Sequence, residues 1–175
     1  LTGVYYLDHI SASYSEPLYD VGKNRWIKKW VEDIAPGLPM PELKWPTEVI
    51  GHITVEGAQR SGLPEGIPVA AGTMDSFADA MSVGVRKPGD AVVIYGSTMS
   101  IVLVTDESLP SAQLWSNAHL FENTYNLASG MATSGSLTKW LRDVCGNTDF
   151  GELSKEAEAV APGSDGLVIL PYFAG

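Results

Sequence analysis

Asp75 is the residue of this sequence best placed for acid–base chemistry. In the stretch VAAGTMDSFADA (69–80) it follows an apolar, strand-like run and a Gly-Thr-Met turn, where a helix is expected to begin. A carboxylate at a strand end faces the crevice in which α/β sheets bind ligands, and it can accept a proton from a hydroxyl there. The alternative is an N-cap that bonds the free N–H groups of the first helical turn. For Asp79, one turn further on, we favour a solvated carboxylate over a second acid.

Two segments of small residues have the composition of anion sites. YGSTMS (95–100) joins two apolar strands, and its N–H groups and hydroxyls could hold a phosphate without any lysine. SGSLTKW (134–140) opens a helix, whose first N–H groups could meet an anion, or let a flat ring approach Gly135. Taken alone, the first is equally typical of a hairpin turn and the second of an ordinary helix start.

The common cofactor and metal motifs are missing from the sequence. It has no GxxxxGK[ST] loop, GxGxxG fingerprint, CxxC pair or HExxH helix. His9, His52 and His119 are too scattered to indicate a metal site, so we interpret each histidine as structural and predict no metal bound by the protein's own side chains.

Composition limits the class of partner. The net charge of −10, from 21 acidic and 11 basic residues, argues against nucleic acid, which needs clustered Lys and Arg. The single cysteine, Cys145, cannot form an internal disulfide and fits a reducing cytoplasm. The most apolar window, 91–104, is too short for a membrane span. We therefore expect a cytoplasmic protein without membrane contact, and both chain ends look cut.

These residues must be positioned by helices mixed with strands. The apolar spacing predicts helices over 25–34, 54–62, 75–83, 134–144 and 150–160, with Thr54 capping the second and Gly62 ending it. Strands are expected over 49–53, 67–72, 91–96, 100–106, 117–121, 124–129 and 166–173, and the strand over 67–72 is expected to be buried. The mixture indicates an α/β protein in two halves joined near Lys87.

The order of the motifs resembles the FGGY family of carbohydrate kinases, which includes xylulose, ribulose, gluconate and glycerol kinases. The segments that carry the resemblance are DHISAS (8–13), GLPEGIPVAAGTMD (62–75), KPGDAVVIYGST (87–98), SGSLTKWLRD (134–143) and LVILPYFAG (167–175). They cover nearly the whole chain and correspond to the middle of a longer kinase. The resemblance implies a ribonuclease H-like fold of the actin and hexokinase type, with 1–87 ending the N-terminal domain and 88–175 starting the C-terminal one.

The resemblance also implies an activity. It is ATP-dependent phosphorylation of a sugar or polyol hydroxyl, a pentulose such as xylulose being favoured, with sugar and ATP meeting between the two domains. Asp75 would accept the proton of the sugar hydroxyl, and Mg²⁺ would bridge the phosphates of ATP. A cap and a base can be the same carboxylate when its second oxygen points into the cleft.

The resemblance assigns further residues to the site. Gly96 and Ser97 correspond to the family's Gly-Thr turn, which contacts the nucleotide phosphates, while Gly135 and Lys139 fall where the nucleotide pocket is lined. Ser76 is expected to face the sugar, where relatives often carry Asn or Gln, and this departure leaves the substrate open. Asp8 either orders the cleft or is structural, and we favour the structural role.

Two rival interpretations stay open. One is a non-catalytic sugar or nucleotide sensor of the same fold, and the other is an α/β binding module without kinase ancestry. The family's N-terminal D-x-G-T phosphate loop and its glycine-rich adenosine segment do not occur in the chain, so we expect the 175-residue chain alone to be inactive. A homodimer is an open expectation, because dimers are common in the family.

Overall fold

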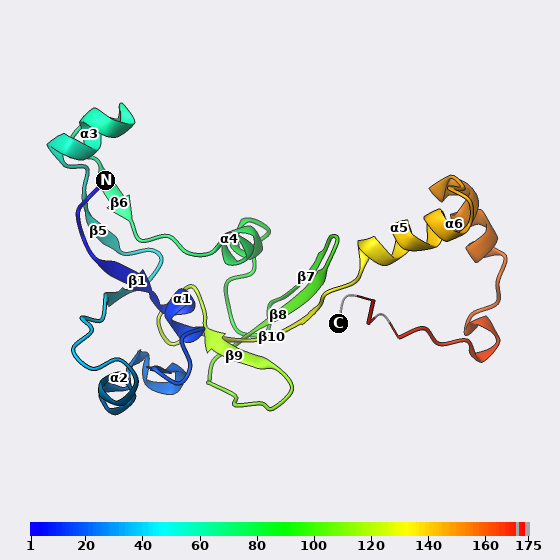
Figure 1. Cartoon of the computed structure of the whole chain (residues 1–175), viewed down its shortest axis with the longest axis horizontal. Coiled ribbons are helices and arrows are strands. Elements are labelled where there is room, and N and C mark those ends of the chain that lie inside the picture. Colours follow the sequence, from blue (N-terminus) through cyan, green and yellow to red (C-terminus); the bar gives the residue numbers. More distant parts are fainter. Residues whose placement is uncertain (171, 174–175) are drawn as a thin grey trace. The chain divides into compact units, whose positions relative to one another are not determined.

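The computed structural model describes residues 1–170 and 172–173, in which helices are interspersed with strands (Figure 1). The helices are α1 (His9–Ser13), α2 (Lys28–Ile34), α3 (Val55–Ser61), α4 (Asp75–Ser82), α5 (Gly135–Val144) and α6 (Phe150–Glu158). The strands are β1 (Tyr6–Asp8), β2 (Tyr19–Asp20), β3 (Arg25–Trp26), β4 (Glu42–Lys44), β5 (Val49–His52), β6 (Pro68–Ala70), β7 (Ala91–Tyr95), β8 (Met99–Thr105), β9 (Trp115–Ala118) and β10 (Tyr125–Met131). None of the helices in the described part of the chain has the length and apolarity needed to cross a membrane.

The chain divides into two compact units. The first comprises Leu1–Val92 with Val102–Ala128, and the second comprises Val93–Ile101 with Ser129–Gly175. The candidate base Asp75 therefore belongs to the first unit, whereas Gly96, Ser97 and Gly135 belong to the second. The boundary expected between 87 and 88 concerns the domains of the family, and it stays a prediction.

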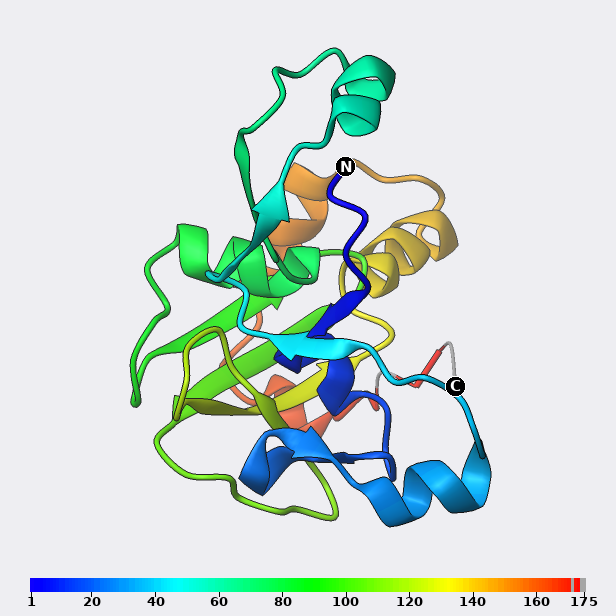
Figure 2. The ribbon, with the colours of Figure 1, turned by 90° about the vertical axis from the view of Figure 1, so that its left-hand side faces the viewer.

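The largest sheet has the strand order β7-β8-β10-β9, with β9 antiparallel to β10. Along β8 the buried Val102 and Val104 alternate with the exposed Ile101 and Leu103, as expected where one face of a sheet packs on a core. Smaller pairs complete the first unit. β1 lies parallel to β4 (Figure 2), and the pairs β2–β3 and β5–β6 are antiparallel.

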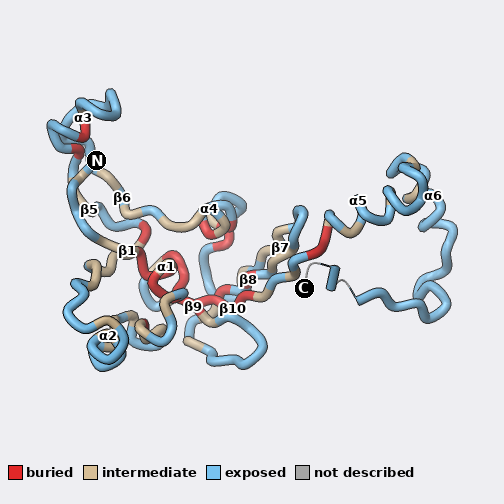
Figure 3. The backbone as a smooth tube through the Cα atoms, in the orientation of Figure 1, coloured by how far each residue is buried: buried red, intermediate tan, exposed pale blue. Residues whose placement is uncertain are grey.

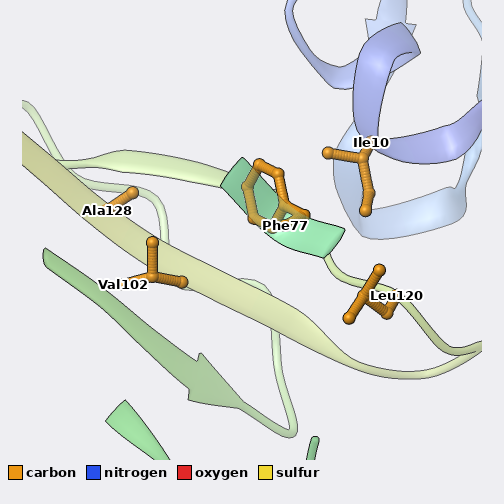
Figure 4. Close-up of a cluster of buried hydrophobic side chains, with 5 residues drawn as sticks. All are labelled: Ile10, Phe77, Val102, Leu120 and Ala128. Carbon is orange, nitrogen blue, oxygen red and sulfur yellow. The ribbon is translucent and has the colours of Figure 1, made fainter. Parts of the chain in front are cut away.

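The core of the first unit joins two helices to this sheet. Ile10 of α1 and Phe77 of α4 belong to one buried cluster with Val102, Leu120 and Ala128 (Figure 4). Figure 3 shows buried residues in α1, α4, β8 and β10, the elements that contribute to this cluster. Fully burying one large apolar side chain stabilises a fold by about 1.5–3 kcal/mol, so Phe77 fixes the start of α4 firmly. Asp75 lies only two residues before this anchor.

Several predicted elements are confirmed, with shifted ends. α3 has Thr54 as its N-cap, accepting from the N–H of Gly57 at 3.0 Å, and ends at Gly62 in the left-handed conformation with φ 75°. The helix expected from residue 25 starts only at Lys28, because Arg25 and Trp26 pair with β2. Strand pairing has overridden a helical apolar spacing here.

Two expectations about strands are wrong. The strand within 67–72 forms as β6, but it is not buried, since both Pro68 and Ala70 are exposed. The strand expected over 166–173 is absent from its described residues, and 167–170 are exposed coil after a short 3-10 turn. An apolar run becomes a strand only where another strand offers hydrogen-bond partners, and this run has none in the described part of the chain. Pro171 lies outside the described residues.

The core contains a histidine in an unusual position. His119 is 0% exposed and packs edge-on against Phe77, with the ring centroids 6.1 Å apart. Neither ring nitrogen has a hydrogen-bond partner among the described residues. Burial lowers the pKa of His119 to about 4, and the nearby charge of Asp90 offsets this only in part.

This lowered pKa predicts acid sensitivity. Because the folded-state pKa lies below the ordinary value of 6.5, the unfolded chain binds the proton first as the pH falls. Stability is then complete above pH 6.5 and declines towards pH 4, by about 1.4 kcal/mol per pH unit. We expect the unfolding free energy from urea titration to fall by about 2 kcal/mol between pH 7 and pH 5. His119→Leu should flatten this dependence and His52→Gln, at an exposed site, should not; an equal slope in His119→Leu would contradict the assignment.

Candidate active site

Asp75 is exposed at the first position of α4. Met74, not Asp75, is the N-cap, so the capping interpretation is wrong by one residue. The Asp75 side chain nevertheless satisfies one first-turn donor, since its Oδ1 accepts from the N–H of Ser76 at 2.7 Å. Its Oδ2 has no hydrogen-bond partner in the described part of the chain and is available to accept a proton. Negative charge is favourable at this end of a helix.

The loop that leads into Asp75 is held from several sides. The N–H of Ala71 donates to the carbonyl of Glu48 at 2.8 Å, and the N–H of Gly72 donates to that of Pro46 at 2.9 Å. The Tyr6 hydroxyl donates to the carbonyl of Ala71 at 2.7 Å. Gly72 has φ +70°, a left-handed conformation that glycine adopts without strain. The loop therefore has a defined path before α4 begins.

Asp8 supplies a further restraint on this loop. Its buried carboxylate caps α1, with Oδ1 accepting from the N–H groups of Ile10 and Ser11, both at 3.1 Å. The same oxygen accepts from the Thr73 hydroxyl at 2.9 Å. Asp8 is thus structural, as favoured from the sequence, and what it structures is the approach to Asp75.

The neighbours of Asp75 differ in exposure. Ser76 is half-buried, and its hydroxyl has no hydrogen bond among residues 1–170 and 172–173. Asp79 is exposed, in line with a solvated carboxylate. Ser76, directly next to the candidate base, therefore offers a half-buried hydroxyl without a hydrogen bond among the described residues.

In the second unit, the 96–98 turn is bound to the start of α5. The N–H of Gly135 donates to the carbonyl of Gly96 at 2.8 Å, and the N–H groups of Ser134 and Ser136 donate to the carbonyl of Ser97 at 3.0 and 3.4 Å. The Ser136 hydroxyl also donates to the carbonyl of Ser97 at 3.0 Å. The first N–H groups of α5 are therefore used by the turn, and the expectation that they meet an anion is not supported.

The turn itself keeps its own donors. Gly96, Ser97 and Thr98 are exposed, and within the described residues neither the N–H nor the hydroxyl of Ser97 or Thr98 is hydrogen-bonded. Adjacent backbone N–H groups in a turn, supplemented by hydroxyls, suit a phosphate group. The turn therefore offers donors of the kind that bind a phosphate group.

Lys139 is less well placed than the 96–98 turn to bind a nucleotide. Its exposed ammonium group donates to Oδ2 of Asp143 at 2.6 Å, one turn along α5. Hydrogen bonds from Lys139 and Arg142 lower the pKa of Asp143 below its usual range. Lys139 would have to leave this ion pair to reach a nucleotide. In the described part of the chain, no three His, Cys, Asp or Glu side chains gather into a possible metal site.

Comparisons with known proteins define first the class and then the family. The crystal structure of xylulose kinase from Rhodospirillum rubrum superposes on the whole chain with a TM-score of 0.90 and 29% identity, and the chain covers 37% of it. The chain thus has the α/β, ribonuclease H-like fold of actin and hexokinase. Residues 1–82 match the model of the N-terminal domain of the FGGY family of carbohydrate kinases. The chain belongs to this family.

Named relatives by sequence include two kinases of different sugars. The xylulose kinase of Lactococcus lactis is 30% identical over 186 residues, which span all of this chain and 35% of the relative. The gluconokinase of Bacillus subtilis is 25% identical over 141 residues, covering 74% of this chain and 28% of the relative. The chain therefore spans about a third of the length of the relatives it matches.

Sequence reasoning missed two residues of the first unit. Tyr6 and Thr73 hold the loop before Asp75, yet neither belongs to a spacing that indicates a contact. Tyr6 and its partner Ala71 are 65 residues apart, as are Thr73 and its partner Asp8, so no local periodicity could reveal these contacts. Thr73 was included in the sequence analysis only as part of the GTMD segment (72–75), without a role of its own.

Gly135 gives a test of the contact between the turn and α5. A Cβ at this position would lie 2.7 Å from the carbonyl oxygen of Gly96, which is backbone and cannot rotate away. Gly to Ala in a helix is ordinarily stabilising, by about 1 kcal/mol. We expect Gly135→Ala instead to lower the unfolding free energy by about 1–3 kcal/mol, as overpacking does. The measurement is urea denaturation.

Gly151 provides the matched control for this substitution. It also lies in the first turn of a helix, but its added Cβ would meet only a side-chain oxygen of Asp149, which can move. Gly151→Ala should therefore cost less than Gly135→Ala. Equal effects of the two substitutions would show that the backbone contact is unimportant.

Proposed function

We propose that the protein containing this chain is an ATP-dependent kinase of a sugar or polyol hydroxyl, with a pentulose such as xylulose as the favoured substrate. Membership of a family of carbohydrate kinases supports the class of reaction. Relatives named as xylulose kinases support the substrate, although gluconokinases and glycerol kinases also match. The observation that carries the proposal is the Asp75 carboxylate, exposed, with a free Oδ2, on a restrained loop.

In the proposed reaction, Oδ2 of Asp75 accepts the proton of the sugar hydroxyl while its oxygen attacks the γ-phosphorus of ATP, the bond from that phosphorus to the β–γ bridging oxygen breaks, and ADP leaves. ATP supplies the γ-phosphoryl group. Phosphoryl transfer depends on positioning and on neutralising charge more than on covalent chemistry, and the protein contributes both. The loop held by Asp8 and Thr73 positions the base. The donors of Ser97 and Thr98 bind the nucleotide phosphates, with Gly96 and Gly135 holding the turn in place.

The remaining residues have smaller roles in this proposal. Ser76 faces the sugar with its free hydroxyl, and Lys139 contributes to the nucleotide pocket only after leaving Asp143. Mg²⁺ commonly binds substrate phosphates with one or two protein carboxylates, and at the phosphates of ATP it would neutralise negative charge. A homodimer and a cytoplasmic location stay predictions from the sequence.

A non-catalytic sensor of sugar or nucleotide is the alternative. Such a protein would keep the fold and the phosphate-binding turn without needing a base. An exposed carboxylate with a free oxygen, on a loop held by four separate side-chain and backbone contacts, favours the enzyme. An enzyme would need Asp75 for turnover, whereas a sensor has no turnover to lose.

Substitution of Asp75 tests the base. In the intact protein we expect Asp75→Asn to lower kcat by about 10²–10⁴-fold, the range of general base catalysis, with substrate binding retained. The assay is coupled ADP release over a panel of pentuloses, hexuloses, gluconate and glycerol. Asp79→Asn, a neutralised carboxylate on the same helix, is the control and should stay near the parent. Turnover that survives Asp75→Asn would reject the base, and absence of turnover in the parent with ATP still bound would favour the sensor.

The 175-residue chain alone is expected to have no kinase activity. It spans about a third of the length of its relatives, and it lacks the family's D-x-G-T loop and adenosine segment. The same ADP-release assay on the purified chain checks this. Sugar-dependent ADP release at any rate above the Asp75→Asn background would overturn it.

A further inference from the structure

Positive charge is concentrated in one short segment of this acidic chain. The sequence GKNRWIKKW (22–30) contains four of the 11 Lys and Arg residues, in a chain with a net charge of −10. Two of them, Lys28 and Lys29, open α2, and no acidic residue lies in its first turn. Cations at the N-terminus of a helix are opposed by the helix dipole. The segment therefore concentrates positive charge at a helix end where the helix dipole disfavours it.

Three of these four cations, Lys23, Arg25 and Lys28, border a cavity of about 580 Å³ in the first unit. This is the size of a site for a small molecule. Its apolar part is formed by Trp26, Ile27, Pro41 and Leu43, and its charged residues are Lys23, Arg25, Lys28, Asp20 and Glu42. An apolar wall with cations beside it suits a ligand that has both a hydrophobic face and an anionic group.

The wall of this cavity is preformed. The indole N–H of Trp26 donates to the carbonyl of Pro41 at 2.9 Å, and Tyr19 packs edge-on against the Trp26 ring at a centroid distance of 5.7 Å. The N–H of Ile27 donates to the carbonyl of Leu18 at 2.7 Å. A flat aromatic surface held in this way loses little conformational entropy when a ring stacks on it.

The carboxylates at the cavity already have cationic partners. Asp20 lies 3.6 Å from the ammonium group of Lys23, and Glu42 lies 2.8 Å from that of Lys44. Arg25 and Lys28 are exposed, and neither is in an ion pair within the described residues. These two cations are free to bind an anion. A guanidinium group suits a phosphate especially well, because it can donate two parallel hydrogen bonds.

We propose that this cavity binds a phosphate monoester of a small ring-containing molecule. Arg25 and Lys28 bind the phosphate, and the ring stacks on Trp26. The site is separate from Asp75 and from the 96–98 turn in its residues, and it does not depend on the kinase activity proposed above. A sugar phosphate and a nucleoside monophosphate share this chemistry and are distinguished by experiment.

The test is calorimetric titration of the intact protein with ribose 5-phosphate, AMP, inorganic phosphate and ribose. We expect at least one of the two esters to bind more tightly than inorganic phosphate and than ribose, since only the esters offer both a ring and a phosphate. The stronger ester identifies the source of the ligand. Failure of both esters to bind in the millimolar range would overturn the proposal.

Substitutions assign this binding to the cavity. Arg25→Gln with Lys28→Gln should weaken ester binding by about tenfold or more, as expected for two charge-assisted contacts. Lys28→Gln alone should give part of this loss, which guards against a misfolded double variant. Lys29→Gln, the matched control, removes one charge from the same helical turn at a residue that does not line the cavity. Equal loss in Lys29→Gln and Lys28→Gln, or full affinity in the double variant, would place the binding elsewhere.

Discussion

The carboxylate of Asp8 is the interaction on which the geometry of the first unit most depends. One oxygen atom caps α1 and also binds the Thr73 hydroxyl, so a single acceptor joins the start of one helix to the approach of another. The group is 7% exposed, and a buried carboxylate is tolerated only when it is hydrogen-bonded. Three donors meet that requirement. The cap and the placement of Asp75 are therefore one structural feature.

In the second unit, the main constraint is the close approach between the 96–98 turn and the start of α5. The first donors of α5 bind the carbonyls of Gly96 and Ser97, while the N–H groups of Ser97 and Thr98 have no hydrogen bond among the described residues. The helix start thus holds the turn in place. Glycine suits position 135 because a Cβ there would lie only 2.7 Å from the carbonyl oxygen of Gly96.

Local features of this fold could be predicted from sequence, and long-range ones could not. Thr54 and Gly62 bound α3 as expected, because capping depends on neighbouring residues. The helix expected over 25–34 lost its first residues to a strand pair, and the apolar run at 167–170 stayed without strand partners among the described residues. The assignment of Asp75 and the 96–98 turn to the site comes from the order of the motifs and stays a prediction. The contacts of Tyr6 and Thr73, and the use of the α5 donors by the turn, depend on segments that sequence spacing does not relate.

The two side chains that restrain the loop before Asp75 reach it across 65 residues of sequence, Tyr6 to Ala71 and Asp8 to Thr73. Contacts of such separation carry a loop-closure cost in entropy and are gained only when the intervening chain has folded. α4, by contrast, is closed by bonds within a few residues. The ordered surroundings of Asp75 are thus a cooperative property of the whole first unit. Loosening of β1 would release the loop while α4 remained helical, so hydrogen exchange at 71–74 would report the integrity of the unit earlier than helix content does.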